Sequence, residues 1–350
     1  MAQAQARWAG DELEVLPDSG LAHTHVRLVG QGALPRIPKH SQMDLAPAAN
    51  LAYQAACFER AARSGYTPAL LGVLAPSAGL PRGALIVEEI VGRAARSPHG
   101  MTAIVTALAR LHQPPLPAAN ARAPLTAAAD PLRDLLAEIE AQAAHLDAAQ
   151  ADPATRRCSD AEIALYRRLC ALPPRPLRCL IAFDARPGNF MVRADGCVVL
   201  VDLEKCRYCQ VPLDLAHATL YTSTTWDATS SAALGVDEGA RAYAEWPRAM
   251  GASASAWSES HLPLRRAMWL WSITWCAKWR VGCGKPGKVV GEDWSTHLSE
   301  PALIAHVRGR VDHYLSRAVV EEVLGQIDAL AQTLQHTDDP DAVIIEPHCP

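Results

Sequence analysis

Short apolar runs interrupted by glycine and proline dominate the beginning of the chain. Residues 13–39 follow this β-like pattern, and so do the runs at 70–74 and 84–90, which a glycine- and proline-containing loop separates. The segment 47–63 predicts one helix, which stops at Ser64-Gly65. This part of the chain is therefore expected to form a small, mostly β unit that carries a single helix.

Helical patterns dominate the rest of the chain. Ile104, Leu108 and Leu111 share one stripe of a helix predicted over 101–112. No internal repeat is present, and the chain ends in an acidic, proline-containing tail, 337–350, which is expected to be disordered. The second part of the chain is therefore expected to be mainly helical.

Two of the later helices carry recognisable start signals. Asp130-Pro131 supplies an N-cap followed by a first-turn proline. Ser159 and Glu162 have the spacing of a capping box and predict the start of the next helix. An extended stretch, 177–184, follows and leads into a hairpin.

The hairpin is the most informative segment of the sequence. Two apolar runs flank Asp195-Gly196, a dipeptide that favours a two-residue type I′ turn. Pairing outward from that turn places Asn189 opposite Asp202, beside the loop that carries Asp184. A few oxygen ligands of this kind suit Mg²⁺, which keeps its other positions for water and phosphate.

The spacing Asp-x-x-x-x-Asn, followed by a hairpin that ends in Asp, matches the catalytic loop of kinases. In that arrangement the first Asp orients or deprotonates the acceptor hydroxyl, and the Asn and second Asp hold the metal. The alternative is an ordinary hairpin with polar ends. We favour the catalytic interpretation, because the spacing, the centred turn and the terminal Asp together are much rarer than the spacing alone.

On these residues the chain resembles the aminoglycoside phosphotransferase and choline kinase family, small-molecule kinases with the protein-kinase fold. The resemblance covers about 13–220 and implies a nucleotide site in the first part of the chain. Its implied members are the covering loop at Ser19 and Gly20, the basic phosphate-binding residue Arg36, and the adenine-binding hinge at 85–92 with Glu88 and Ile90. Further matches to family segments are Leu108-Ala-Arg-Leu-His112 and Pro212-Leu-Asp214-Leu-Ala216.

Three departures from the family pattern affect the expected site. Ala182-Phe183 stands before Asp184, where the family usually has His-Gly. Arg186 stands where His or Lys is common, and a cation there can still meet the γ-phosphate. The helix glutamate that usually pairs with the basic strand residue is replaced by Gln54, or else is Glu59 in another register.

Composition narrows the function classes. A chain of 350 residues with 49% hydrophobic residues can fill the cores of two lobes, which excludes general disorder. A net charge of -4 disfavours a nucleic-acid partner. No apolar run reaches the roughly 18 residues of a membrane helix, and the first residues lack a signal-peptide core, so no membrane partner is expected. The ten cysteines then indicate reduced thiols and the cytoplasm.

Several other features admit two interpretations. Trp271, Trp275 and Trp279 recur at helical spacing, which favours a packed helix face over an aromatic wall for a cationic or sugar-like acceptor. The Cys206–Cys209 spacing and the alternating His23 and His25 resemble metal ligands, but neither set is complete, and we disfavour a metal at both.

The sequence as a whole predicts an α+β, bilobal protein-kinase-like fold. The N-lobe is expected at 1–92, and the helical C-lobe, which carries the catalytic loop and acceptor site, at 93–336. With ATP and Mg²⁺ as cofactors, the enzyme is expected to phosphorylate a hydroxyl of an amino sugar, amino alcohol or similar small molecule. The expected catalytic residues are Asp184 and Arg186, and the metal ligands Asn189 and Asp202. A nucleotide-binding pseudokinase and a non-catalytic binding protein remain as alternatives.

Overall fold

The structure is a computed structural model that describes most of the chain. The described residues are 8, 10–18, 20–172, 178–251, 257, 259–283 and 298–337. Two predictions therefore concern residues outside the described part: the role of Ser19 and the tail beyond 337. None of the described helices is long and apolar enough to cross a membrane.

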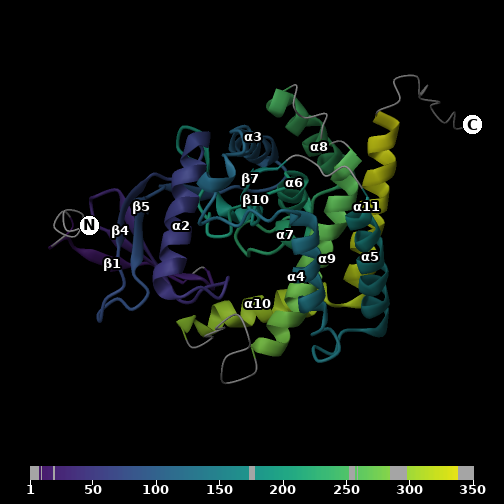
Figure 1. The fold of residues 1–350 in the computed structure, drawn as a ribbon, viewed down its shortest axis with the longest axis horizontal. Helices are drawn as coiled ribbons and strands as arrows, with labels where there is room; N and C mark the ends of the chain where they lie inside the picture. Colours follow the sequence, from purple (N-terminus) through teal and green to yellow (C-terminus); the bar gives the residue numbers. More distant parts are fainter. Residues whose placement is uncertain are drawn as a thin grey trace, which may run out of the picture.

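An antiparallel sheet of five strands forms the N-lobe, in the order β1-β2-β3-β5-β4. The strands are β1 Leu13–Val15, β2 His23–Leu28, β3 Ala33–Pro38, β4 Leu70–Leu74 and β5 Ala84–Glu88. Helix α2, Pro47–Ala61, packs on β4 and β5, and a short 3-10 turn ends it at Gly65, where φ is 74°. Glycine adopts this left-handed conformation at little cost, which explains the predicted stop. Figure 1 shows this lobe at the N-terminal end of the molecule.

Two small sheets lie where the lobes meet. Their strands are β6 Gly92–Ala94, β8 Phe190–Arg193 and β9 Val198–Leu200 in one sheet, and β7 Cys179–Ile181 and β10 Arg207–Cys209 in the other. Strand β6 follows the N-lobe directly and pairs with β8, the first strand of the predicted catalytic hairpin. The segment that links the lobes is therefore hydrogen-bonded to the hairpin that carries the expected metal ligands.

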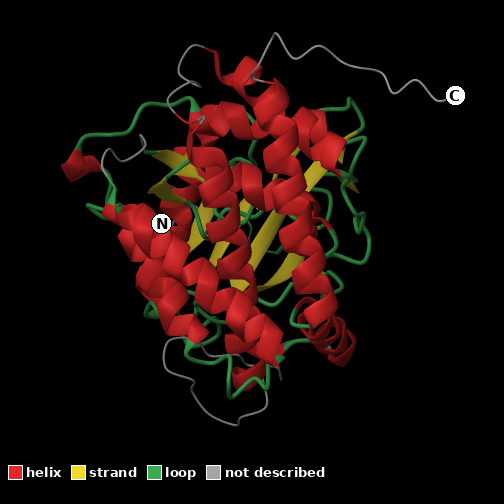
Figure 2. Cartoon of the chain, turned by 90° about the vertical axis from the view of Figure 1, so that its right-hand side faces the viewer, coloured by secondary structure: helices red, strands yellow, loops and turns green. Residues whose placement is uncertain are grey.

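Helices make up the rest of the described chain. They are α3 Met101–His112, α4 Pro131–Ala143, α5 Pro153–Ala171, α6 Pro212–Thr219, α7 Tyr221–Thr224, α8 Val236–Met250, α9 His261–Gly282, α10 Pro301–Tyr314 and α11 Arg317–Thr337. Helix α9 is buried along most of its length, because α4, α5, α6, α10 and α11 all pack on it. Figure 2 shows the helices in front of the strands when the molecule is turned by 90°. The mainly helical C-lobe that the sequence predicted is confirmed.

One polar contact joins the N-lobe to α10. The Lys39 ammonium, at the end of β3, donates to both carboxylate oxygens of Asp18 at 2.6 Å and to the Ser299 hydroxyl at 3.1 Å. Asp18 also accepts a hydrogen bond of 3.1 Å from the Glu300 backbone N–H, at the start of α10. Helix α10 runs under the C-lobe towards the N-lobe in Figure 1, so this contact ties the loop before β2 to a helix almost three hundred residues later in the chain.

The hairpin forms with a register one residue different from the predicted one. Val201, not Asp202, lies opposite Asn189, and its N–H donates to the Asn189 carbonyl at 2.9 Å. A type I′ turn would need positive φ at both central residues, but only Gly196 has it, with φ 83°, whereas Asp195 does not. The loop therefore holds three residues rather than two, which shifts the pairing.

The predicted start of α5 was also wrong. The helix begins at Pro153, and Asp152 is its N-cap, accepting a hydrogen bond of 2.7 Å from the Ala154 N–H. Ser159 lies inside the helix, where its hydroxyl donates to the Thr155 carbonyl at 2.9 Å. The upstream Asp-Pro pair is the stronger start signal, as at α4, where Asp130 caps the helix as predicted.

These two sites allow a direct test of the corrected helix boundary. Asp152→Ala should lower the free energy of unfolding by about 1 kcal/mol, because the Ala154 N–H loses its partner. Ser159→Ala should change it by less than about 0.5 kcal/mol, since the helix backbone remains bonded. Denaturant titration of both variants measures the difference. A larger loss of unfolding free energy for Ser159→Ala than for Asp152→Ala would instead support the predicted capping box as the start of the helix.

Candidate active site

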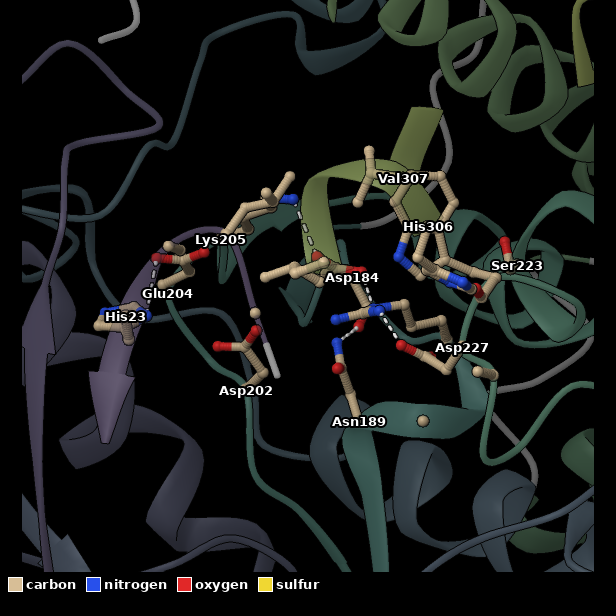
Figure 3. A pocket seen from close by; sticks show the side chains of 18 of the residues that line it. His23, Asp184, Asn189, Asp202, Glu204, Lys205, Ser223, Asp227, His306 and Val307 are labelled. Atoms are coloured by element: carbon tan, nitrogen blue, oxygen red, sulfur yellow. Dashed lines mark hydrogen bonds and ion pairs between the residues drawn. The ribbon is translucent and has the colours of Figure 1, made fainter. Parts of the chain in front are cut away.

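A cavity of about 560 Å³ lies between the two lobes. It is lined by the loop before β2, by the segment from Asp184 to Lys205, and by residues of α7, α9 and α10. Figure 3 shows Asp184, Asn189 and Asp202 around this cavity. The three residues that the sequence predicts for acceptor activation and metal binding are therefore brought together, with Arg36 and Arg186 on the same lining.

Asp184 is a partly buried carboxylate among cations. Lys205 donates to it at 2.9 Å, and the Arg186 guanidinium lies 3.4 Å away. Burial alone would raise the pKa of Asp184, but Lys205, Arg186 and His217 outweigh it, so the pKa lies below its ordinary value. Burial lowers the pKa of His217 to about 4, so this ring is neutral near pH 7. Asp184 is therefore ionised, as a group that accepts a hydroxyl proton must be.

The loop before Asp184 is held without the family's usual histidine. The backbone N–H groups of Ala182 and Phe183 donate to the two carboxylate oxygens of Asp214, at 2.7 and 2.8 Å. His112 binds the same carboxylate at 3.0 Å, and Trp246 donates to the other ring nitrogen of His112 at 3.2 Å. The two family segments that contain His112 and Asp214 thus meet under the loop. The loop's backbone N–H groups at Ala182 and Phe183 are bonded without the usual histidine.

Phe183 adopts a backbone conformation that favours glycine, the residue usual at this position of the family. Its φ is 59°, which costs a larger side chain on the order of 1 kcal/mol or more. Its ring is fully buried, packs edge-on against Trp271 with centroids 5.2 Å apart, and lies 3.7 Å from the Arg207 guanidinium. These contacts hold the strained residue in place and so fix the direction in which Asp184 points.

Arg186 is oriented by a second carboxylate, Asp227, which precedes α8. Its guanidinium donates to Asp227 at 2.6 Å and also faces Asp184. Asp227 lies so close to Gly188 that a Cβ atom on Gly188 would be 2.0 Å from a carboxylate oxygen. Gly188 is thus required for this ion pair, and the pair positions the cation expected to meet the transferred phosphoryl group.

Asn189 and Asp202 offer the oxygen donors that Mg²⁺ prefers. The Asn189 amide nitrogen donates to the Asp184 carbonyl at 2.7 Å, which leaves the amide oxygen for a cation. Asp202 supplies a carboxylate on the same lining. Although they are not paired in the hairpin, the two side chains fit a magnesium site together with a nucleotide phosphate.

Arg36 reaches across the lobes to this carboxylate. Its guanidinium donates to the Asp202 side chain at 2.6 Å and to the Val201 carbonyl at 2.5 Å. Burial alone would raise the pKa of Asp202, but Arg36 and then His23 hold it well below its ordinary value. The basic residue of the N-lobe is thus placed where the phosphates of a metal-bound nucleotide would lie.

In the family, a helix glutamate usually pairs with the basic residue at the position of Arg36, and here Gln54 takes its place. Its side chain is buried and accepts from the His23 ring at 3.0 Å, and the other ring nitrogen of His23 lies 3.4 Å from Arg36. Glu59 is exposed on the far side of the helix. Of the two registers, the structure therefore supports Gln54, with His23 between it and Arg36.

Glu204 is a buried acid that was not predicted from the sequence as a site residue. It accepts from Gln42 at 2.6 Å and lies 3.6 Å from His23. Burial, and then the charge of Asp202, raise the pKa of Glu204 to about 8. With His23 and Asp202 it forms the one group of three potential metal-ligating side chains in the described ranges.

The predicted hinge lies outside the lining of this cavity. Gly20 and Arg36 line it, whereas Glu88 and Ile90 do not. The Glu88 carboxylate instead accepts from Arg193, on β8, at 2.7 Å. Its side chain therefore ties the end of β5 to the hairpin, which leaves only the backbone of this segment for a nucleotide base.

The helical row of tryptophans is divided between core and cavity. Trp279 is buried with 1% of its surface exposed, which agrees with the packing interpretation. Trp271 and Trp275 line the cavity on the side away from the N-lobe. Trp271 is also buried, with 7% of its surface exposed, and packs on Phe183, so this residue combines core packing with pocket lining.

Comparison with known proteins settles the family. The model of the phosphotransferase enzyme family matches residues 16–251, about two thirds of the chain. The chain belongs to this family. It is a phosphotransferase with the protein-kinase-like fold, as predicted from Asp184, Asn189 and Asp202.

Solved structures agree with the fold at low sequence identity. A choline/ethanolamine kinase family protein from Mesorhizobium loti has 17% identity and a TM-score of 0.55, over 95% of this chain and 99% of that one. An ethanolamine kinase from Plasmodium vivax has 13% identity and a TM-score of 0.59, over 90% and 85%. An ADP-bound aminoglycoside phosphotransferase has 14% identity and a TM-score of 0.50, over 89% and 95%. Among curated proteins, no match was found.

Two charged residues of the site were missed from the sequence. Lys205 follows the predicted hairpin, and its spacing from Asp202 could have indicated that it faces the same cavity. Asp227 lies in an irregular stretch between α7 and α8, and no motif marks it. Only the folded chain shows that Asp227 pairs with Arg186.

The raised pKa of Glu204 predicts a specific pH dependence of stability. Its folded pKa of about 8 exceeds the ordinary carboxyl value of 4.5, so its stabilising contribution is complete below the lower value and is lost as pH rises towards 8. In metal-free buffer, unfolding free energy should fall by about 1–2 kcal/mol between pH 6.5 and 8, and Glu204→Gln should remove this fall. Glu12→Gln, at an exposed site, should keep it. An equal fall of unfolding free energy with pH in wild type and both variants would show that Glu204 does not cause it.

Proposed function

We propose that this phosphotransferase moves the γ-phosphoryl group of ATP to a hydroxyl of a small molecule. The observation that carries the proposal is the convergence of Asp184, Asn189, Asp202 and Arg36 on one cavity between the lobes. Relatives solved with ADP and with GDP support a purine nucleotide as the donor. Relatives described as choline and ethanolamine kinases support a small alcohol as the acceptor.

Each residue has a role that its surroundings suit. Asp184 accepts the proton of the attacking hydroxyl, and the amide of Asn189 is oriented by the carbonyl of Asp184. Arg36 and Arg186 both line the cavity and supply positive charge for the phosphates. Mg²⁺, when held by Asn189 and Asp202, neutralises phosphate charge. Positioning and charge neutralisation supply most of the rate enhancement.

A nucleotide-binding pseudokinase is the main alternative. The absent histidine before Asp184 and the Gln54 substitution favour it, whereas the presence of all three polar residues of the catalytic motif opposes it. The support that Asp214 gives to the loop also opposes it, because two backbone N–H groups just before Asp184 remain bonded without the histidine. We therefore retain the catalytic function.

Nucleotide binding is the first test. Calorimetric titration with Mg·ATP and Mg·GTP should give binding of at least one of them, weakened by removal of the metal. If neither nucleotide binds at about millimolar concentration, which corresponds to a binding free energy of roughly -4 kcal/mol, the kinase and the pseudokinase are both excluded.

Two isosteric variants should separate the roles of the carboxylates. Asp184→Asn should lower turnover by about 10²-fold or more while Mg·ATP affinity stays nearly unchanged, because Asp184 acts on the acceptor hydroxyl. Asp202→Asn should lower both turnover and Mg·ATP affinity, since it removes the charge that holds the metal. Asp195→Asn, in the exposed hairpin turn, is the matched control.

Single-turnover rates and Mg²⁺-dependent ATP affinity measure these effects. Retention of more than about a tenth of the wild-type rate by Asp184→Asn would show that another group activates the acceptor. Unchanged Mg²⁺ dependence in Asp202→Asn would move the metal site away from the hairpin.

A further inference from the structure

The part of the cavity beyond Asp184 is largely aromatic and apolar. Trp226, Trp271, Trp275 and Tyr314 line it, together with aliphatic residues of α10 such as Leu303. The nearby Thr222 and Ser223 add hydroxyl groups, which are polar but uncharged. An acceptor that reaches Asp184 from this side therefore meets a mainly apolar surface.

The aromatic faces are already occupied by groups of the chain itself. The Lys205 ammonium lies 5.8 Å from the centroid of the Trp271 ring, within the range of a cation–π contact. Trp226 is stacked on Tyr314 with centroids 6.2 Å apart, and meets the Trp275 ring edge-on at 5.5 Å. The Trp271 ring thus already binds the Lys205 ammonium group.

The carboxylates near the acceptor are also paired. Lys205 and Arg186 bind Asp184, and Arg186 binds Asp227 at 2.6 Å, so two cations balance two anions. Glu300, at the exposed start of α10, is in contact with water, where its charge is screened. Asp184 and Asp227 thus each have a cation within 4 Å, and the second oxygen of Asp227 is buried without a hydrogen-bond partner.

We propose that the acceptor is an uncharged alcohol with an apolar body, and that Lys205 is the residue that discriminates against amines. This inference rests on the proposed phosphotransfer to a hydroxyl. An ammonium group in this space would meet the positive charges of Lys205 and Arg186 beside carboxylates that these cations already pair, whereas a neutral body gains burial against Trp275. Lys205 acts as a specificity residue through its charge.

A pair of isosteric probes tests the role of charge alone. The probes are choline and the dimethylbutanol in which a carbon atom replaces the ammonium nitrogen. Their binding to wild-type protein saturated with Mg·ADP, where no transfer occurs, is followed by quenching of tryptophan fluorescence. Lys205→Met removes the charge and keeps an unbranched side chain, and Lys205→Arg keeps the charge.

Wild-type protein should bind the neutral alcohol at least about tenfold more tightly than choline. Lys205→Met should shift this ratio at least about tenfold towards choline, and Lys205→Arg should keep the wild-type ratio. A wild-type preference for choline, equal ratios in all three proteins, or binding of neither probe would overturn the inference. Should Lys205→Met fail to fold, the wild-type ratio still decides. The Mg·ADP titration is read separately, so loss of nucleotide binding would reject the proposed function instead.

Discussion

Ionised side chains can lie largely out of solvent between the lobes of this protein only because each has an opposite charge within reach. Asp202 has Arg36, Asp184 has Lys205, and Arg186 has Asp227. Removing one partner from such a pair usually costs several kcal/mol, because the other charge is left without compensation. The positions of the catalytic groups are therefore interdependent, and the fold around them serves to hold the pairs at their observed distances.

This constraint also explains why the departures from the family pattern are compatible with one another. Arg36, the basic residue of strand β3, has a glutamine rather than a glutamate on the helix of its own lobe. It pairs instead with Asp202 across the cavity. Lys205 compensates the charge of Asp184, and Asp214 holds the backbone of the loop in which the family usually has a histidine. Each lost interaction is replaced by a contact from a segment distant in the sequence.

The sequence was sufficient for the parts of the site that follow from local spacing. Asp184, Asn189 and Asp202 lie within one short segment, and the N-lobe strands and the helix at 101–112 follow from simple apolar patterns. What it could not give depends on backbone torsions or on tertiary contacts. The hairpin register depends on a single positive φ, and the position of Asp227 depends on how a loop without a motif packs over Gly188.

The contact between Asp18 and the start of α10 has a consequence for how the molecule can be divided. The loop before β2 supplies the carboxylate that accepts from the Glu300 N–H, and Lys39 holds that carboxylate in place. Helix α10 in turn forms one wall of the acceptor cavity. The C-lobe made alone would keep Asp184 and its metal ligands, but its acceptor wall would lack the anchor at one end. The two lobes are thus one unit of assembly, although most of the catalytic residues belong to only one of them.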